Sequence, residues 1–296
     1  MRRAALLLVA AALLVWLVRR VGGGELVTVL RGLHGGLLAA ALFLFVPITL
    51  LTAARWRTVA AGLAPLSLVD ALRMVLAASA ANVVLPAKLG DVGKGAFLPG
   101  AVGRAGGVAL ALFEKLADLA ALAACMLVAS LLAPPEREAE MLACVLATGV
   151  VTGFAVLCVV PLGALSAFGS DNPLARAAQG FATLRGRPRR LLGVLAGSLL
   201  LWSLHLLQFQ LAAWAAGATA DPAVLASRIP MAIFVGLLPV SFAGIGTRDA
   251  ALLYLLAPWL GEPVALALGA FATLRYLVPA AAGAFLLGGY RSATAS

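Results

Sequence analysis

Two stretches of this sequence decide the fold, because each interrupts an apolar segment with a cluster of proline and glycine. Ala81–Leu98 reads ANVVLPAKLGDVGKGAFL, and Gly236–Leu253 reads GLLPVSFAGIGTRDAALL. The apolar regions that contain them, Leu68–Leu98 and Ile229–Leu260, leave halves shorter than the ~20 residues that a helix needs to cross a bilayer. We therefore predict that each region forms two short helices joined as a re-entrant hairpin, whose irregular backbone is surrounded by protein or water.

The composition places both stretches in a membrane protein. Of the 296 residues, 63% are hydrophobic and only 11% are charged, and the mean hydropathy is +1.06. So little polar surface cannot cover a water-soluble globule, which excludes a soluble enzyme, a disordered chain and a disulfide scaffold. The net charge of +10 does not indicate nucleic-acid binding, because so much of the chain must face lipid. The three cysteines have no metal-ligand or CxxC spacing and are interpreted as small apolar side chains.

Six other apolar segments are predicted to cross the membrane as full helices. The first follows the basic start Met1-Arg2-Arg3, and because no small-residue cleavage site follows it, we expect a retained helix rather than a signal peptide. This first segment has only 15 residues, so its flanking arginines are expected to snorkel toward the interface. The six segments are Ala4–Val18, Leu33–Ala54, Val108–Ala133, Met141–Leu162, Leu191–Gly217 and Val264–Gly289.

The distribution of basic residues orients these segments. With both termini in the cytoplasm and each hairpin entering and leaving on one side, the cytoplasmic segments hold 13 basic residues, Arg55 among them, and the outside segments hold 5, Arg228 among them. The acidic run of Glu136, Glu138 and Glu140 then lies outside. The sequence therefore predicts a multi-pass protein of the cell inner membrane with cytoplasmic N- and C-termini.

The two broken regions also indicate an internal duplication. Leu85-Pro86 recurs as Leu238-Pro239, 153 residues later, and GDVGK at 90–94 resembles GIGTR 154 residues later. Residues 1–296 are therefore predicted to form one membrane domain of two halves with opposite orientation, about 1–134 and 141–290. Inverted repeats with broken helices are typical of secondary transporters, whose substrate sites lie between the breaks.

Charged side chains inside the predicted spans require partners. Glu114 and Asp118 are four residues apart and share one helix face, where a carboxylate surrounded by hydrocarbon needs a cation. We predict an ion pair between either of them and Arg275 in the last span; a pair that only fixes packing and a pair that rearranges during transport both stay open. His205 and Gln208 form a polar stripe, which we interpret as an interhelical hydrogen bond.

The two breaks supply the parts of an anion site. Helix N-termini and glycine backbone offer N–H donors, and fixed positive charge stands beside them. The alternative is that proline and glycine only shape a turn while the basic side chains snorkel to the interface. The break residues are Pro86, Gly90, Gly93, Pro239, Gly244 and Gly246, and the neighbouring cations are Lys88, Lys94 and Arg248.

Motifs for catalysis, cofactors and metals are not found in the sequence. The run GDVGKGAF lacks the GxxxxGK[ST] spacing of a P-loop, and neither HExxH nor a Cys/His cluster occurs. We therefore expect a protein without enzymatic activity, cofactor or metal.

The sequence resembles the flippase-like family that includes the transmembrane region of lysylphosphatidylglycerol synthases, over nearly the whole chain. Aspartate stands at Asp91 and Asp249 where the family often has glutamate, and lysine stands at Lys94 and Lys115 where it often has arginine. The resemblance implies lipid translocation rather than lipid aminoacylation. It rests on Asn82, Pro86, Gly90, Asp91 and Lys94, on Glu114, Lys115 and Asp118, on Pro239, Ser241, Gly244, Gly246, Arg248 and Asp249, and on Arg275.

Together these features predict an all-α lipid flippase that moves an anionic phospholipid or a polyprenyl-linked intermediate between leaflets by alternating access. A membrane-embedded lipid or polyprenyl-phosphate transferase and a non-catalytic subunit of an envelope-lipid complex are the alternatives. The expected partners are membrane lipids, and a homo-oligomer or a lipid-modifying enzyme stays open. The expected substrate-binding residues are Asn82, Lys88, Lys94, Ser241, Arg248 and Arg275, and the expected ion-pair or coupling residues are Asp91, Glu114, Asp118 and Asp249.

Overall fold

Every regular element in the described part of the chain is a helix. The computed structural model describes residues 2–61, 64–85, 89–98, 103–160, 182, 185–238 and 244–294. The elements are α1 (Arg2–Val21), α2 (Gly23–Arg31), α3 (Gly35–Phe43), α4 (Phe45–Ala60), α5 (Leu68–Val84), α6 (Leu89–Gly93), the 3₁₀ helix η2 (Lys94–Phe97), α7 (Gly103–Ser130), α8 (Glu138–Val159), α10 (Pro188–Ala215), α11 (Pro222–Leu237), α12 (Thr247–Leu260) and α13 (Glu262–Thr294).

Four stretches are long and apolar enough to cross a membrane, which confirms a multi-pass protein. They are Gly35–Ala60, which joins α3 to α4, then α8, α10 and Glu262–Phe285 of α13. The two other predicted spans are also helical. α1 has 20 residues, more than the predicted 15, because the helix continues through Arg19 and Arg20 in its last turn, where cations favour the helix dipole. α7 has 28 residues and carries the predicted intramembrane charges.

The chain breaks near the predicted positions. α5 ends at Val84 and α6 begins at Leu89, and α6 lies so close to α5 that a Cβ on Gly90 would be 2.5 Å from a backbone oxygen of α5. Gly93 has open space around its Cα and simply ends α6. Gly90 is therefore explained by close packing, whereas Gly93 is not.

The second break lies between α11 and α12. Gly244 and Gly246 adopt φ of +77° and +87°, a backbone conformation that favours glycine, and the backbone N–H of Gly246 donates to Asp249 at 3.0 Å to cap α12. α11 begins at Pro222, earlier than the predicted Ile229, because Asp221 caps it. The predicted Pro86, Lys88, Pro239 and Ser241 lie outside the described residues.

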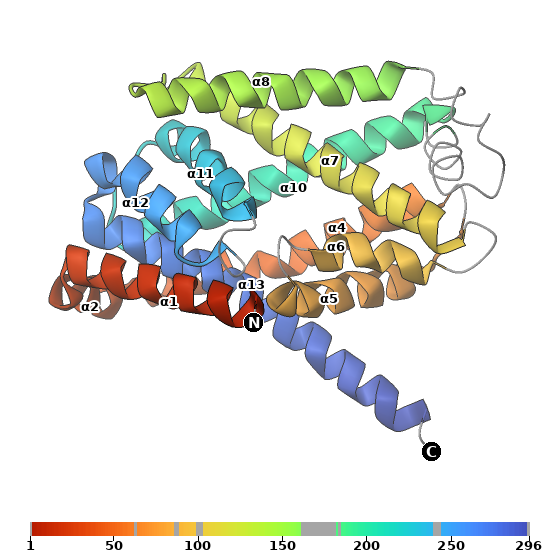
Figure 1. The fold of residues 1–296 in the computed structure, drawn as a ribbon, viewed down its shortest axis with the longest axis horizontal. Helices are drawn as coiled ribbons and strands as arrows, with labels where there is room; N and C mark the ends of the chain where they lie inside the picture. The colour runs from red at the N-terminus through yellow and green to blue at the C-terminus, as the bar shows by residue number, and fades with distance from the viewer. Residues whose placement is uncertain are drawn as a thin grey trace.

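The two broken regions lie in different halves of the molecule. Figure 1 shows α8 and α10 running along the long direction, with α5 and α6 toward one end and α11 and α12 toward the other. Each region has its own buried core: one formed with α4, α7 and α10 around α5, and one formed with α7, α10 and α13 around α11 and α12. α7 and α10 contribute to both cores and so connect the two halves.

Candidate functional site

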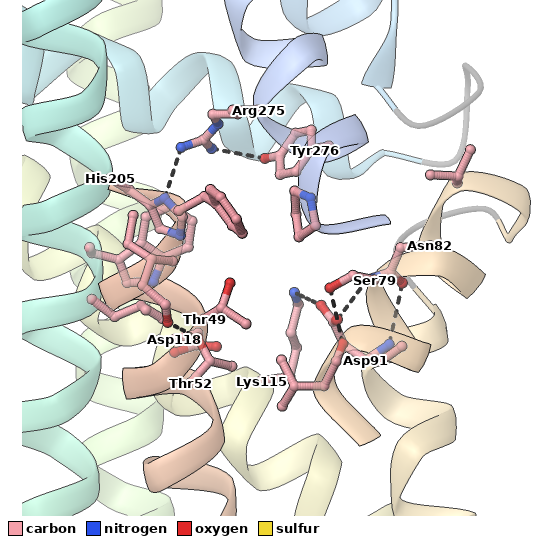
Figure 2. Close-up of a pocket in the computed structure, with 18 of the residues that line it drawn as sticks. Thr49, Thr52, Ser79, Asn82, Asp91, Lys115, Asp118, His205, Arg275 and Tyr276 are labelled. Atoms are coloured by element: carbon pink, nitrogen blue, oxygen red, sulfur yellow. Dashed lines mark hydrogen bonds and ion pairs between the residues drawn. The ribbon is translucent and has the colours of Figure 1, made fainter. Parts of the chain in front are cut away.

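A cavity of about 210 Å³ lies between the two broken regions. Residues beside the first break line it, among them Asn82 and Asp91, and so do Ile245 and Arg248 beside the second break. Long helices complete its wall, with α4, α7, α10 and α13 all contributing side chains. Figure 2 shows side chains from several helices converging on this space. The charged lining residues are Arg55, Asp91, Lys94, Glu114, Lys115, Asp118, Arg248 and Arg275.

Arg55 of α4 holds the two predicted carboxylates of α7. Its guanidinium donates two hydrogen bonds to Asp118, one of them at 3.0 Å from Nη2, and a third to Glu114 at 3.1 Å. It also donates to the hydroxyl of Ser198 at 2.7 Å. The side chains of Arg55 and Glu114 are 2% and 3% exposed, so this is a buried network that joins α4, α7 and α10.

Lys94 of η2 completes this network. Its ammonium lies 2.5 Å from the second carboxylate oxygen of Glu114, and it stands over the ring of Trp56 at 4.5 Å. η2 approaches α7 closely because glycine meets glycine there: a Cβ on Gly95 would be only 2.0 Å from the carbonyl oxygen of Gly107. The short helix after the first break is thus fixed to α7 by backbone packing and by an ion pair.

Asp91 forms a second, smaller ionic cluster on α6. Lys115 of α7 pairs with its Oδ2 at 3.0 Å. The side chain of Asn82 donates to Asp91 Oδ1 at 2.6 Å and accepts from the Asp91 backbone N–H at 3.3 Å. The predicted Asn82 therefore bridges the two sides of the first break, as Figure 2 shows.

Arg248 and Asp249 form the matching cluster on the second half. Arg248 pairs with its neighbour Asp249 at 2.8 Å and also donates to Thr273 Oγ1 at 2.8 Å on α13. Arg248 and Asp249 are buried, at 3% and 2% exposure. A Cβ on Gly269 would lie 2.9 Å from the Asp249 carboxylate, so α13 fits tightly against this pair.

The ion pair predicted between Arg275 and Glu114 or Asp118 is wrong. Those carboxylates are held by cations of α4 and η2. Arg275 turns instead toward α10, where its Nη1 lies 2.9 Å from His205 Nδ1 and 3.4 Å from Gln208 Oε1. On its other side it donates to the hydroxyl of Tyr276 at 3.0 Å. Within the described part of the chain, no carboxylate pairs with this 5% exposed guanidinium.

The polar stripe of α10 has two roles. Gln208 donates to the backbone oxygen of Ala41 at 2.9 Å, which confirms the predicted interhelical hydrogen bond. His205 and Gln208 also line the cavity and supply the uncharged contacts of Arg275.

Residues 3–283 match the family described as the lysylphosphatidylglycerol synthase TM region. The chain belongs to this family. A search of curated proteins finds no match.

In this member of the lysylphosphatidylglycerol synthase TM region family, the cavity collects most of the predicted site residues. Asn82, Asp91 and Lys94 come from the first broken region, and Arg248 comes from the second. Asp249 does not line the cavity; it pairs with Arg248, which does. The described residues contain no group of His, Cys, Asp and Glu suited to hold a metal ion.

Two arginines of this family member, Arg55 and Arg228, form buried ion pairs that the sequence does not predict. Arg55 was expected in a cytoplasmic loop and Arg228 in an outside loop, but both are buried, at 4% and 1% exposure. Arg228 pairs with Glu140 at 3.2 Å and lies over the ring of Trp259 at 5.0 Å. The only sequence signal for Arg55 is that Glu114 and Asp118 need a buried cation, and several arginines near span ends satisfy that condition.

Proposed function

We propose that this protein translocates an anionic lipid between leaflets, with the head group in the cavity and the tails in the bilayer. The observation that carries the proposal is that one cavity is lined by residues beside both helix breaks and contains Arg275, a buried cation that pairs with no carboxylate among the described residues. Sites between broken helices are where secondary transporters bind their substrates, and family membership is consistent with lipid handling.

The proposed mechanism is alternating access between two inverted halves. Lys94 and Arg248 occupy corresponding places in the similar motifs GDVGK and GIGTR. Each reaches the long helix that follows its own broken region: Lys94 binds Glu114 of α7, and Arg248 binds Thr273 of α13. The two broken regions also lie toward opposite ends of the molecule in Figure 1. These correspondences support two re-entrant hairpins that open toward opposite sides of the membrane.

The ion pairs stabilise the buried cations of the cavity before a lipid binds. Lys94, Lys115 and Arg248 are each held by a carboxylate. An incoming phosphate would compete for these cations, loosening η2 from α7 or α12 from its neighbours. Arg275 pairs with no carboxylate in the part of the chain that the structure describes, and it would bind the phosphate first.

The same pairs count against the alternative of a lipid transferase. Glu114 accepts from Arg55 and Lys94, and Asp118 accepts two hydrogen bonds from Arg55. A general base must be available to take a proton from its substrate. Because both carboxylates are already paired with cations, neither is available to a substrate as a general base, and we therefore propose a non-enzymatic role.

The test is a leaflet-accessibility assay in liposomes that contain the full chain and trace fluorescent phospholipid. Dithionite quenches the label only in the outer leaflet, so translocation appears as loss of the protected half. Arg275→Gln is expected to slow translocation about ten- to a hundredfold, because a charge-assisted hydrogen bond contributes ~1.5–3 kcal/mol. Arg57→Gln is the matched control, since Arg57 is exposed on α4 and its loss removes the same charge.

Wild type and Arg57→Gln should translocate equally. Equal protection in wild type, Arg275→Gln and protein-free vesicles, for phosphatidylglycerol, phosphatidic acid and a polyprenyl-phosphate probe alike, would refute the proposed function.

A further inference from the structure

We propose that the cavity selects a head group whose only charge is one phosphodiester anion and whose remainder is uncharged and carries hydroxyls. A phosphodiester-linked polyol head group has this chemistry; an aminoacylated, positively charged head group does not. The inference rests on the proposed function and narrows its substrate class.

The carboxylates of the cavity leave no place for a cationic head group. Glu114 is shared by Arg55 and Lys94, and Asp118 is held by Arg55. Asp91 is paired with Lys115 and accepts from an amide. A buried ammonium needs a carboxylate of its own. To bind a lysyl group, the cavity would have to break one of these pairs and leave a second cation uncompensated.

The charges of the described lining residues and their partners would be balanced by one additional negative charge rather than two. Four of the five lining cations have carboxylate partners, and Arg275 has none among the described residues. On binding first to Arg275, a phosphodiester monoanion would neutralise this guanidinium while every existing pair is still intact, before any pair is loosened during transport. A phosphomonoester dianion or a diphosphate would bring at least one further negative charge without a matching cation. Charge balance in a buried site therefore favours the diester.

Arg275 is held by contacts that an anion can replace. Its partners His205, Gln208 and Tyr276 are not carboxylates, and its buried Nε has no hydrogen-bond partner among the described residues. Hydrogen bonds from a guanidinium to an anion are about twice as strong as those between neutral groups. An incoming phosphate oxygen could therefore take over part of the guanidinium fork and satisfy Nε.

His205 is arranged to accept this exchange. Its Nδ1 lies 2.9 Å from Arg275 Nη1 and 3.1 Å from Gln208 Oε1. One ring nitrogen of a neutral histidine either accepts or donates, so these two contacts belong to different tautomers. With Arg275 as donor, Nδ1 accepts; once the anion takes Arg275, the other tautomer can donate to Gln208. The site thus has a hydrogen-bond partner for His205 in both the empty and the occupied state.

The wall across the cavity from Arg275 offers uncharged hydroxyl contacts. Figure 2 shows Thr49, Thr52 and Ser79 around the space below Arg275 and Tyr276. Thr52 and Ser79 donate their hydroxyl protons to backbone oxygens of their own helices at 2.7 and 3.0 Å, so their oxygens can still accept. A ligand hydroxyl could donate to these two oxygens, whereas the hydroxyl protons of Thr52 and Ser79 are already used in bonds to backbone oxygens and are not offered to a second anion.

Native mass spectrometry of the purified full chain with paired lipids tests this selection. In one competition, short-chain phosphatidylglycerol and lysylphosphatidylglycerol are added in equimolar amounts. In a second competition, phosphatidylglycerol and phosphatidic acid are added in the same way. We expect phosphatidylglycerol to be retained at least about tenfold over each competitor, the ratio that a ~1.4 kcal/mol preference gives. Arg275→Gln should reduce the ratio to near one, Arg275→Lys should keep part of it, and the exposed-site control Arg57→Gln should keep all of it.

Preferential retention of the lysyl lipid, or an unchanged ratio in Arg275→Gln, would overturn the inference. The two proposals can fail separately. Translocation of all anionic lipids at one rate would refute only the proposed head-group selectivity, while Arg275-dependent binding without translocation in liposomes would refute only the proposed transport. Soluble glycerophosphoglycerol and inorganic phosphate form the third arm. Displacement of the lipid by either one at equal concentration would assign the subsite to a free phosphate compound and refute a lipid head group.

Discussion

The buried pair of Arg55 and Asp118 yields a quantitative prediction of stability. Arg55→Met removes the cation that pairs directly with Asp118 and the donor to Ser198, while Glu114 keeps Lys94. Removing one partner of a buried ion pair typically costs ~3–5 kcal/mol, because the other charge stays buried and uncompensated. The exposure of Arg55 is only 2% and that of the Asp118 side chain 14%, so water cannot compensate the lost contact fully.

The reverse change should cost less. Asp118→Leu leaves Arg55 with Glu114 as its carboxylate partner, so we expect ~1.5–3 kcal/mol, the contribution of hydrogen bonds to a charged group. In the double variant Arg55→Met with Asp118→Leu, no charge of this pair remains unpaired. Replacing a buried pair by apolar side chains is often nearly neutral, so the double variant should be at least ~2 kcal/mol more stable than the sum of the single changes predicts.

Reversible unfolding by SDS in mixed micelles, followed by tryptophan fluorescence, measures these free energies. Arg57→Met on the same helix is the control; because Arg57 is exposed, its change should stay within ~0.5 kcal/mol. If the two single effects add to within ~0.5 kcal/mol, as they do for independent sites, the pair does not contribute as the structure indicates. The buried network of α4 and α7 would then not stabilise the fold through these ion pairs.

Three further predictions concern packing and orientation. Gly95→Ala should lower stability by more than ~3 kcal/mol in the same micelle assay, above ordinary overpacking, whereas Gly93→Ala, in open space, should be neutral or slightly stabilising; equal behaviour would contradict the close contact of η2 with α7. Arg228→Met should cost ~3–5 kcal/mol because it strands a buried carboxylate, while Arg137→Met, which breaks a contact at an exposed site, should cost under ~1 kcal/mol. In a cysteine-free background, Glu138→Cys should react with a membrane-impermeant maleimide added to intact cells; labelling only after lysis would reverse the proposed orientation.

The helices and their breaks could be predicted because the membrane imposes them locally. A chain with so few charges must bury its backbone polar groups in helices, and proline and glycine mark where a helix stops. The break between α5 and α6 was predicted from the proline and glycine of Ala81–Leu98, whereas the short length of α6, Leu89–Gly93, was not. The close packing of η2 on α7 could not be predicted in this way. The sequence shows that Gly95 and Gly107 are small, and only the fold shows that their backbones are in contact.

The sequence predicts that the carboxylates form ion pairs but does not predict which cations they pair with. The sequence shows that Glu114 and Asp118 need a cation, but a hydropathy pattern places Arg55 at the end of a span. In the fold, α4 continues to Ala60, and α7 brings the carboxylates to Arg55 across 59 and 63 residues of chain. Arg275 was assigned to them from its place in the second half, yet it turns to His205. Which cation a carboxylate selects depends on helix rotation, which no local pattern determines.

Arg275 differs from the other described cations of the cavity because those cations pair with carboxylates. A buried arginine is stabilised most simply by a carboxylate, and this protein uses that solution repeatedly. At Arg275 it uses neutral acceptors and the faces of Phe209 and Tyr276, at 4.7 and 4.8 Å, which offset only part of the desolvation of a guanidinium. If packing were the only role of this side chain, an uncharged residue would serve better. A cavity-lining guanidinium that pairs with no carboxylate among the described residues is instead what an anion-binding site requires, because the bound anion then completes the charge balance.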